Sequence, residues 1–514
     1  MVVAGRVIFH PYRRNGLSLP PPQGCMMLQT DHLPADVKRP AYDRSQLKTR
    51  MIHIGFGAFH RAHQALCSDK LAELGSDWGY CEVNLNSGAL IQALREQDLL
   101  YTLTEKSDDA LETRVIGIIT SALHGKTDGI EAVIEALCQP DVAIVSMTVT
   151  EKGYCHLPAS GDLDVQHADI QHDLAQPDQP HSLPGLIVAA IRRRRERGVA
   201  PFSVMSCDNM PENGRVTRNV VMQLARQYDA SLADYIQQNL TFPSTMVDRI
   251  VPAMNDAAFD ALRQRIGSRD PVAVEAEPFF QWVIEDHFVS GRPDWDKAGA
   301  QLVQDVLPFE QMKLRMLNGS HSFLAYLGYL AGYEHISDCM ADDAFRAAAR
   351  ALMVNEQAPT LTIQDVDLSA YADALIARFA NRAIKHRTYQ IATDGTQKLP
   401  QRFLDSLRWH LDHGTPCPLL LLGIAAWMRY VSAVDEKGEP IEIRDPLNAQ
   451  LATCVAESDD GEARVRALLN ISRVFGDDLA KNDALVKQLT ACYLQLAAQG
   501  ARASVQQAIA GPEV

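Results

Sequence analysis

Residues 51–63 read MIHIGFGAFHRAH, and this stretch decides the fold class. Residues 51–54 are of the β type and lead into Gly55, and residues 58–74 carry apolar side chains at helical spacing. A strand, a tight glycine turn and a helix in this order are typical of a Rossmann-type fold, whose turn approaches the pyrophosphate of a dinucleotide. The sequence therefore predicts an α/β dinucleotide-binding unit that begins here.

The turn supplies the first candidate cofactor-binding residues. Gly55 and Gly57 would allow the backbone to approach a pyrophosphate closely, and Phe59, His60 and Arg61 open the following helix. His60 stands where the usual G-x-G-x-x-G motif has its third glycine, so the match is partial. The glycines could instead shape an ordinary strand–helix turn, but their position directly after a buried strand favours the dinucleotide.

Glu82 is the candidate for the ribose of the cofactor. It lies about 20 residues beyond the turn, where an acidic residue binds the ribose 2′-hydroxyl of NAD in this fold. It falls inside the expected strand at residues 79–85, whereas Asn84, Asn86 and Ser87 lie at the end of that strand, which weakens the assignment. No arginine follows at once to bind a 2′-phosphate, and this favours NAD over NADP.

Two further strand candidates extend the expected sheet. Residues 142–149 (VAIVSMTV) are typical of a strand that is buried on both faces. Residues 202–207 form the next one, and the polar, turn-forming residues 208–214 follow it where the functional rim of a sheet should lie. Because such strands alternate with helices, we expect a parallel sheet.

The character of the sequence changes near residue 308. The segments beyond it that read as amphipathic helices are residues 309–334, 342–356, 369–379, 400–413, 417–434, 461–475 and 481–509. We therefore predict an α/β Rossmann-type domain over residues 42–300 and a mostly α-helical domain over residues 301–514. Residues 1–41 contain a proline run but no apolar signal-peptide core, and they predict a disordered or mis-started N-terminal extension.

Composition excludes several classes of partner. The 49 Lys and Arg residues against 64 Asp and Glu give a net charge of −15, which repels nucleic acid and anionic membranes. An anionic substrate would therefore need a local basic pocket. The ten cysteines are scattered without paired spacing, which indicates reduced thiols and a cytoplasmic protein.

The segment EQMKLRMLNGSH, residues 310–321, is the sharpest candidate for catalysis. On an α-helix with ~100° per residue, Lys313, His321 and Asn318 project within about 140° of one another and share one face. A buried lysine of lowered pKa can accept a hydroxyl proton, and an asparagine amide can hold the developing alkoxide. An isolated lysine would be read as an exposed helix residue, but the apolar neighbours of Lys313 indicate burial.

Zinc chemistry is the alternative route to alcohol oxidation. It needs three spaced Cys, His or carboxylate ligands around an open position. The sequence has neither an H-E-x-x-H motif nor a cluster of cysteines. We therefore expect no metal in the reaction.

Three motifs together resemble the polyol-specific long-chain (mannitol) dehydrogenase family. They are Lys313-x4-Asn318-x2-His321, the segment SCDN at residues 206–209 with Asn213-Gly214, and FPSTMVDR at residues 242–249. The resemblance runs from about residue 45 to residue 510. The family includes mannitol 2-dehydrogenases and fructuronate reductases (D-mannonate oxidoreductases).

The resemblance implies roles for several residues. Lys313 would be the general base, Asn209 and Asn318 would hold the oxyanion, and His321 would contact substrate hydroxyls. Glu310, one helical turn before the lysine, would relay the proton to solvent. Thr150 and Glu151 would lie near the nicotinamide, and Asp248 near the substrate. The alternatives are that Asp248 only pairs with an arginine and that Glu151 only caps a helix.

The segment at residues 385–402 looks more like the fructuronate reductases of that family than like its mannitol dehydrogenases. Gln390 stands where the mannitol pattern has an arginine, and Lys398 matches a family substrate contact. Lys385, Arg387, Lys398 and Arg402 concentrate positive charge in an acidic protein, as a substrate carboxylate requires. A solvated basic loop is the alternative for all of them except Lys398.

The resemblance implies NAD-dependent, reversible oxidation of D-mannonate at C5 to D-fructuronate. The nearest alternative is a mannitol, arabinitol or other polyol dehydrogenase on the same scaffold. A protein that binds the dinucleotide as a sensor without catalysis is the alternative from another class. Turnover of a carboxylate-bearing sugar would separate the three.

Overall fold

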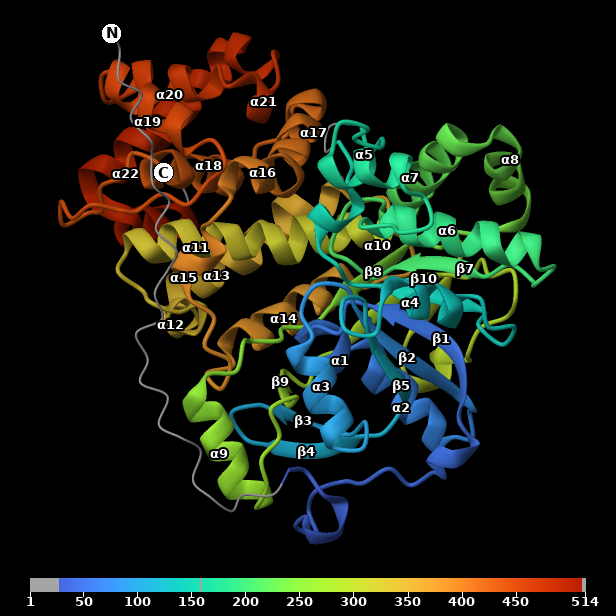
Figure 1. The fold of residues 1–514 in the computed structure, drawn as a ribbon. Coiled ribbons are helices and arrows are strands. Elements are labelled where there is room, and N and C mark those ends of the chain that lie inside the picture. Colours follow the sequence, from blue (N-terminus) through green and yellow to red (C-terminus); the bar gives the residue numbers. More distant parts are fainter. Residues whose placement is uncertain (1–26, 158–159, 511–514) are drawn as a thin grey trace, which may run out of the picture.

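The computed structural model describes residues 27–157 and 160–510. It confirms a Rossmann-type sheet domain followed by a mostly helical domain (Figure 1). The central sheet has five parallel strands in the order β5-β2-β1-β6-β7. Its strands are β1 (Lys48–Ile54), β2 (Trp78–Asn84), β5 (Ile119–His124), β6 (Ile144–Met147) and β7 (Ser203–Ser206).

Helices cover both faces of this sheet. Ile52 and Ile54 of β1 pack in one buried cluster with α4, α6 and α7, whereas Met51 packs in the other with α2 and α3. The alternation follows from the two-residue period of a strand. The helices of this domain are α1 (Ala58–Ala62), α2 (Gln64–Glu73), α3 (Ala89–Glu96), α4 (Ile130–Leu137), α5 (Ala168–Ala175), α6 (Leu183–Glu196), α7 (Asn213–Tyr228), α8 (Ala230–Asn239) and α9 (Asp256–Ile266).

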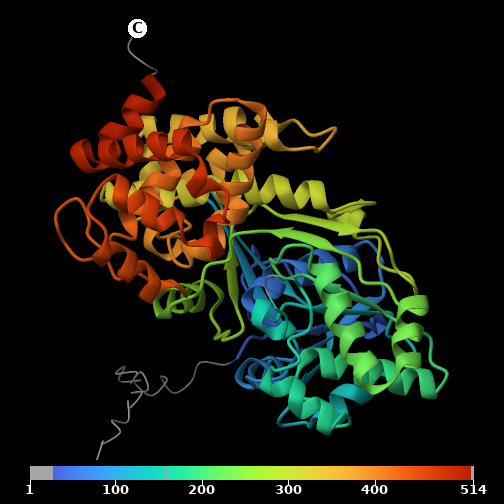
Figure 2. The ribbon, with the colours of Figure 1, turned by 90° about the horizontal axis from the view of Figure 1, so that it is seen from above.

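Two small sheets complete the first domain. One has the order β4-β3-β9 and the other β11-β10-β8, and the second lies between the two halves of the molecule (Figure 2). Met246 and Val283 of this sheet pack with Phe309 at the start of the helical domain. Their strands are β3 (Tyr101–Lys106), β4 (Leu111–Ile116), β8 (Thr245–Asp248), β9 (Val274–Ala276), β10 (Gln281–Glu285) and β11 (Gln301–Val303).

The helical domain is built around α11, in which every residue but Tyr329 is buried. Three π-helical segments interrupt the helices of this domain at Lys313–Asn318, Leu352–Gln357 and Pro400–Leu404. The α-helices are α10 (Leu307–Met312), α11 (Gly319–Leu330), α12 (Ile336–Ala341), α13 (Asp343–Ala351), α14 (Leu368–Ala380), α15 (Thr388–Ile391), α16 (Gly395–Leu399), α17 (Asp405–His413), α18 (Pro418–Tyr430), α19 (Asn448–Glu457), α20 (Glu462–Leu469), α21 (Ser472–Phe475) and α22 (Asp483–Ala510).

The expected N-terminal extension is only partly described. Residues 1–26 lie outside the described residues. The prediction of disorder is wrong for the segment that follows, because Leu28, Leu33 and Val37 are buried in one cluster with Val115.

None of the helices in the described ranges is long and apolar enough to cross a membrane. The nine cysteines in these ranges form no disulfide bonds.

Candidate active site

Lys313 lies where the helical domain meets the sheet. Its side chain is buried, and its Nζ donates to Asn209 Oδ1 at 2.7 Å and to the Val247 carbonyl at 2.9 Å. Asn209 follows the carboxyl end of β7, and Val247 belongs to β8. Burial lowers the pKa of Lys313 to about 8, with a smaller opposing effect of Asp248. A pKa in this range suits a general base, and that role of Lys313 stays a prediction.

The helix around Lys313 is not the regular α-helix that the sequence predicts. Lys313–Asn318 is a π-helical turn, and the Gly319 N–H donates to the Leu314 carbonyl five residues back. A π-helix has more residues per turn than an α-helix, so the angle between Lys313 and Asn318 is smaller than in an α-helix, and both side chains line the same cavities. Asn318 Nδ2 has no partner within the described part of the chain. It is free to donate to a substrate oxygen.

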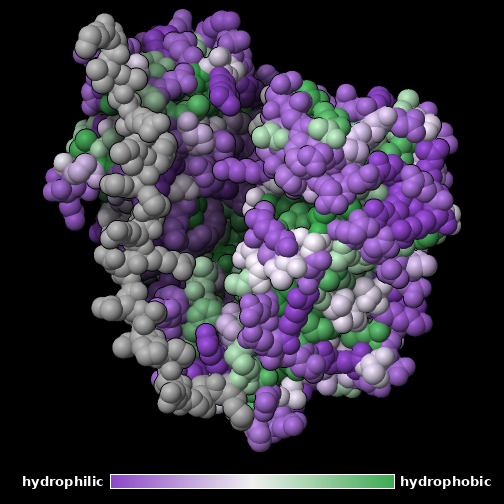
Figure 3. All heavy atoms as spheres, in the orientation of Figure 1, coloured by the Kyte–Doolittle hydropathy of each residue, from purple (hydrophilic) through white to green (hydrophobic). Residues whose placement is uncertain are grey.

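Two cavities meet at Lys313 and Asn318, and both residues line each of them. The smaller has a volume of about 190 Å³ and the larger about 670 Å³. Figure 3 shows a hollow in the surface between the two halves of the molecule. The predicted residues that line the smaller cavity are Asn209, Glu310, Lys398 and Glu151, and those that line the larger one are Asp248, His321, Arg387 and Gln390.

His321 and Glu310 flank the lysine. His321 is stacked on Phe379 with ring centroids 4.7 Å apart, and its Nε2 has no partner in the ranges that the structure describes. Burial lowers the pKa of His321 well below its usual value, so the ring is neutral. Burial raises the pKa of Glu310 to about 7, and its carboxylate accepts the Glu212 N–H at 3.0 Å. A carboxyl of this pKa can pass protons to and from the lysine near neutrality.

Asp248 is held by an arginine from the helical domain. Its two oxygens accept from the Arg378 guanidinium at 2.8 and 3.0 Å, and the same guanidinium binds Glu277. This buried pairing accounts for the position of Asp248 without a substrate, as the alternative interpretation anticipated. Its carboxylate still lines the larger cavity, and a contact with substrate stays a prediction. Arg378 was not predicted, because nothing near it in the chain marks it.

The basic segment at residues 385–402 contains an exposed residue at the rim of the larger cavity, Arg387, and two less exposed residues at the smaller cavity, Lys398 and Arg402. Arg387 has a 60% exposed side chain and lies 3.7 Å from Glu334, so it is a solvated rim residue. Arg402 donates to the Asn318 carbonyl at 3.2 Å and to Ser322 Oγ at 2.9 Å. Burial lowers the pKa of Arg402 to about 10 and that of Lys398 to about 8. Lys398 and Arg402 therefore place positive charge at the smaller cavity, which Lys313 and Asn318 also line.

A third cavity, of about 470 Å³, lies at the carboxyl ends of β1, β2 and β6. Gly55 is required here because its φ is +103° and an added Cβ would lie 2.1 Å from the Thr148 carbonyl oxygen. Asn86, Ser87 and Thr150 line this cavity, hereafter the cofactor cavity. Glu151, the next residue after Thr150, lines the smaller of the two cavities at Lys313, hereafter the catalytic cavity of the proposed site. The arrangement fits an extended dinucleotide whose reactive end points toward Lys313.

The structure corrects the assignment of His60, Arg61 and Glu82 to the cofactor. His60 and Glu82 are fully buried and contact each other at 2.9 Å beneath the turn. Arg61 is buried and donates to the carbonyl of Val272. These side chains bond to neighbouring side chains or to the backbone in the interior, and none of them lines the cavity described above.

The other residues of the turn differ in their positions. Phe59 stacks on His63 at 4.8 Å and is not among the residues that line the cofactor cavity. Gly57 has an ordinary extended conformation and directly precedes α1. Asn84, at the end of β2, accepts the Phe56 N–H at 2.8 Å and thereby fixes the turn.

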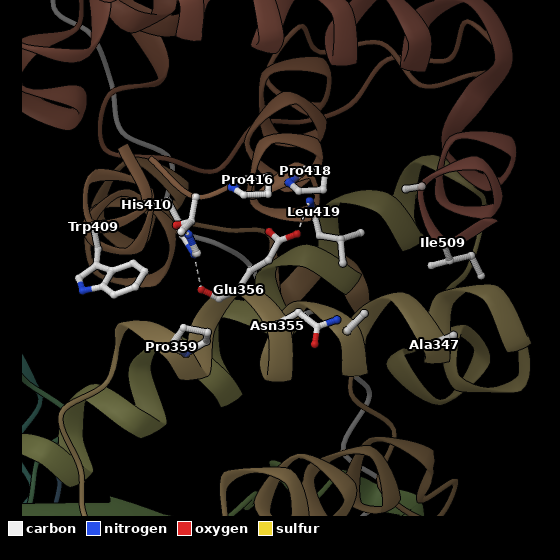
Figure 4. A pocket seen from close by; sticks show the side chains of 13 residues that line it. Ala347, Asn355, Glu356, Pro359, Trp409, His410, Pro416, Pro418, Leu419 and Ile509 are labelled. Carbon is white, nitrogen blue, oxygen red and sulfur yellow. Dashed lines mark hydrogen bonds between the residues drawn. The ribbon is translucent and has the colours of Figure 1, made fainter. Parts of the chain in front are cut away.

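A separate cavity of about 610 Å³ lies within the helical domain (Figure 4). The buried Glu356 carboxylate accepts the N–H groups of Leu419 and Leu420 at the start of α18, and His410 donates to the Glu356 carbonyl. Each polar group of this pair is thus used to cap or join helices. No cluster of three or more potential metal ligands occurs among residues 27–157 and 160–510.

Comparisons with known proteins agree with this architecture. Residues 49–297 match the mannitol dehydrogenase Rossmann domain, and residues 305–497 match the mannitol dehydrogenase C-terminal domain. The chain is 56% identical to the uncharacterized oxidoreductase YdfI of Escherichia coli K12, with 92% of this chain and 98% of that protein covered. It is 53% identical to the D-mannonate oxidoreductase of the same organism, with 91% and 97% covered.

A solved structure shows the same fold. The Pseudomonas fluorescens mannitol 2-dehydrogenase ternary complex with NAD and D-mannitol has a TM-score of 0.83 and 38% identity, and the match covers 95% of this chain and all of that one. The resemblance drawn from the three sequence motifs is therefore confirmed. The chain belongs to the mannitol dehydrogenase family of oxidoreductases.

Proposed function

We propose that the protein interconverts D-mannonate and D-fructuronate with NAD(H), without a metal, and that Lys313 is its general acid and base. The observation that carries this proposal is the buried Lys313 amine, which is bonded to Asn209 where the two cavities meet. The 53% identity to a D-mannonate oxidoreductase supports the choice of substrate. The bound NAD of the mannitol 2-dehydrogenase complex supports the choice of cofactor.

In the oxidation direction, neutral Lys313 takes the proton of the C5 hydroxyl. Asn209 accepts from Lys313 through its Oδ1, which leaves its amide Nδ2 to donate to the substrate oxygen together with that of Asn318. Glu310 then receives the proton from the lysine and passes it toward solvent. The cavity lined by Gly55, Asn86 and Thr150 would hold NAD, which would supply the acceptor for the hydride that leaves C5.

The pH dependence follows from the lysine. Oxidation needs the free amine, so kcat for D-mannonate should rise with pH and level off above about 8. Reduction needs the ammonium form, so kcat for D-fructuronate should be constant below about 8 and fall above it. Initial rates across pH 5.5 to 10 with saturating substrates measure both limbs. If the pH profiles of oxidation and reduction have inflections at clearly different pH values, one shared acid–base residue cannot account for both.

The substrate carboxylate is proposed to bind beside Arg402 and Lys398. Arg402→Gln should lower kcat/KM for D-fructuronate by about 10- to 100-fold, since a charge-assisted hydrogen bond in a desolvated site is lost. Arg387→Gln should have a smaller effect, because the Arg387 side chain is 60% exposed at the rim. Equal losses in the two variants would place the carboxylate elsewhere.

A substrate panel tests the proposed function as a whole. NADH oxidation at 340 nm is measured with D-fructuronate, D-tagaturonate and D-fructose, each with and without EDTA. We expect turnover of D-fructuronate that EDTA does not change, and little turnover of fructose. Turnover of fructose equal to that of D-fructuronate would favour the mannitol or arabinitol alternative, and binding of NADH without any turnover would favour the sensor.

A further inference from the structure

The loop that separates the cofactor cavity from the catalytic cavity has an unusual backbone. Thr150 has φ 66° and ψ 161°, a region that is essentially restricted to glycine. A β-branched residue is particularly disfavoured at positive φ. Such a conformation persists only where the surrounding structure determines it, so specific contacts must hold Thr150.

The Asp208 carboxylate makes those contacts. Its Oδ1 accepts the Thr150 N–H at 2.9 Å, and its Oδ2 accepts the Val149 N–H at 3.0 Å. The hydroxyl of Tyr154, fully buried at the end of the same loop, donates to Oδ2 at 2.6 Å. Three donors from one loop therefore converge on one carboxylate. Burial raises the pKa of Asp208, and the three donors favour its ionised form.

The same residue is tied to the catalytic face. Asp208 directly precedes Asn209, whose Oδ1 accepts from Lys313 Nζ at 2.7 Å. The Asp208 carbonyl accepts from Asn213 Nδ2 at 3.1 Å, which fixes the main chain at this point. Val149 and Thr150 line the cofactor cavity, whereas Asp208 and Asn209 line the catalytic cavity. Asp208 thus links the loop that lines the cofactor cavity to Asn209, which is hydrogen-bonded to Lys313 in the catalytic cavity.

We infer that Asp208 is a positioning residue, which holds the Val149–Thr150 peptide in its strained form so that the nicotinamide end of the cofactor faces the Asn209–Lys313 pair. The inference rests on the proposed function for the reaction that it affects. It assigns Asp208 no proton transfer and no contact with substrate. Its effect should therefore appear in cofactor alignment and leave the ionisation of the base unchanged.

Asp208→Asn is the direct test, because the amide has nearly the same shape but offers one acceptor oxygen and turns an NH₂ group toward the loop donors. We expect kcat to fall by about 100-fold, as for a misplacement of about 1 Å at a reacting centre. The dissociation constant for NAD should rise about tenfold through loss of loop order. Binding of ADP-ribose, which lacks the nicotinamide, should be unchanged in calorimetry, and the pH inflection near 8 should stay in place.

Relief of the backbone strain provides a second variant. Glycine adopts the φ of Thr150 freely, so adding Thr150→Gly to the Asp208→Asn variant should raise its kcat about tenfold.

Asp270→Asn is the matched control. Asp270 is a buried carboxylate that accepts the N–H groups of Thr102 and Val272 and a side-chain bond from Gln97, and it lines none of the four cavities. It should lower thermal stability and leave kcat and NAD binding unchanged.

The outcomes separate this inference from the proposed function. If the wild type turns over D-fructuronate and Asp208→Asn has the same kcat and NAD affinity as the wild type, the positioning role alone is overturned. Equal weakening of NAD and ADP-ribose binding would also overturn it, because the whole cavity would then have been disturbed. If the wild type turns over no sugar acid, the proposed function is refuted. The comparison of NAD binding with ADP-ribose binding in Asp208→Asn would still test the positioning role of Asp208.

Discussion

Lys313→Ala is expected to lower kcat for both directions of the sugar-acid reaction by about 10²- to 10⁴-fold, the usual contribution of a positioned acid or base. The variant removes the amine that Asn209 and the Val247 carbonyl hold between the cavities. Binding of NADH should be preserved, because the cofactor cavity lies beyond Thr150 and is not lined by Lys313. Steady-state rates and NADH fluorescence titration measure the two quantities separately.

A surface lysine provides the control for this variant. Lys297 has a 61% exposed side chain and pairs with Asp294 at 2.7 Å, so Lys297→Ala should retain the wild-type kcat. Lys313→Arg keeps a positive charge but cannot release its proton near neutral pH, so it should be as impaired as the alanine variant in oxidation. Full kcat in Lys313→Ala would rule out the lysine as the proton-transfer residue.

Asn318→Ala is expected to have the next largest effect, a loss of about 10²- to 10³-fold in kcat, as for removal of one oxyanion donor. The buried Nδ2 of Asn318 has no partner in the described residues. We expect it to donate a hydrogen bond when a substrate oxygen is bound. The loss should fall on kcat more than on KM, because charge on that oxygen develops in the transition state.

Asn318→Asp sharpens this prediction. The carboxylate has almost the same shape but replaces the donor with an acceptor, so it should repel the alkoxide and be at least as inactive as the alanine variant. Asn239, an exposed residue that donates to the Tyr235 carbonyl in α8, is the control, and Asn239→Ala should be fully active. An Asn318→Asp variant of wild-type kcat would show that this side chain does not contact the reacting oxygen.

The sequence predicts the central sheet well where strands are buried on both faces. The largely apolar runs at residues 51–54 and 142–149 correspond to β1 and β6, because a strand between helices on both faces is mostly apolar. β5, at one edge of the central sheet, was not predicted, and neither were the strands of the two small sheets, such as β8 and β9. β9 pairs with β3, which lies far away in the sequence, and such pairings leave no local pattern.

The candidate catalytic residues can be named from the sequence because they form local motifs, whereas their packing cannot be predicted. Glu82 has the right spacing for a ribose contact, but spacing does not tell which side of a strand a carboxylate faces, and here it faces His60. Arg378 binds Asp248 from a position 130 residues away in the chain. The π turn at Lys313–Asn318 changes the angle between base and amide, and an α-helical period cannot anticipate it.

The central claim is that the Lys313 amine itself transfers the proton, and chemical rescue tests it most directly. Lys313→Ala is assayed in the oxidation of D-mannonate with saturating NAD while small primary amines of different pKa are added. The account predicts a rate that rises with the concentration of unprotonated amine and with its basicity, and no such rise in Asn318→Ala. A Lys313→Ala variant that binds NAD normally but gives no amine-dependent rate would contradict it.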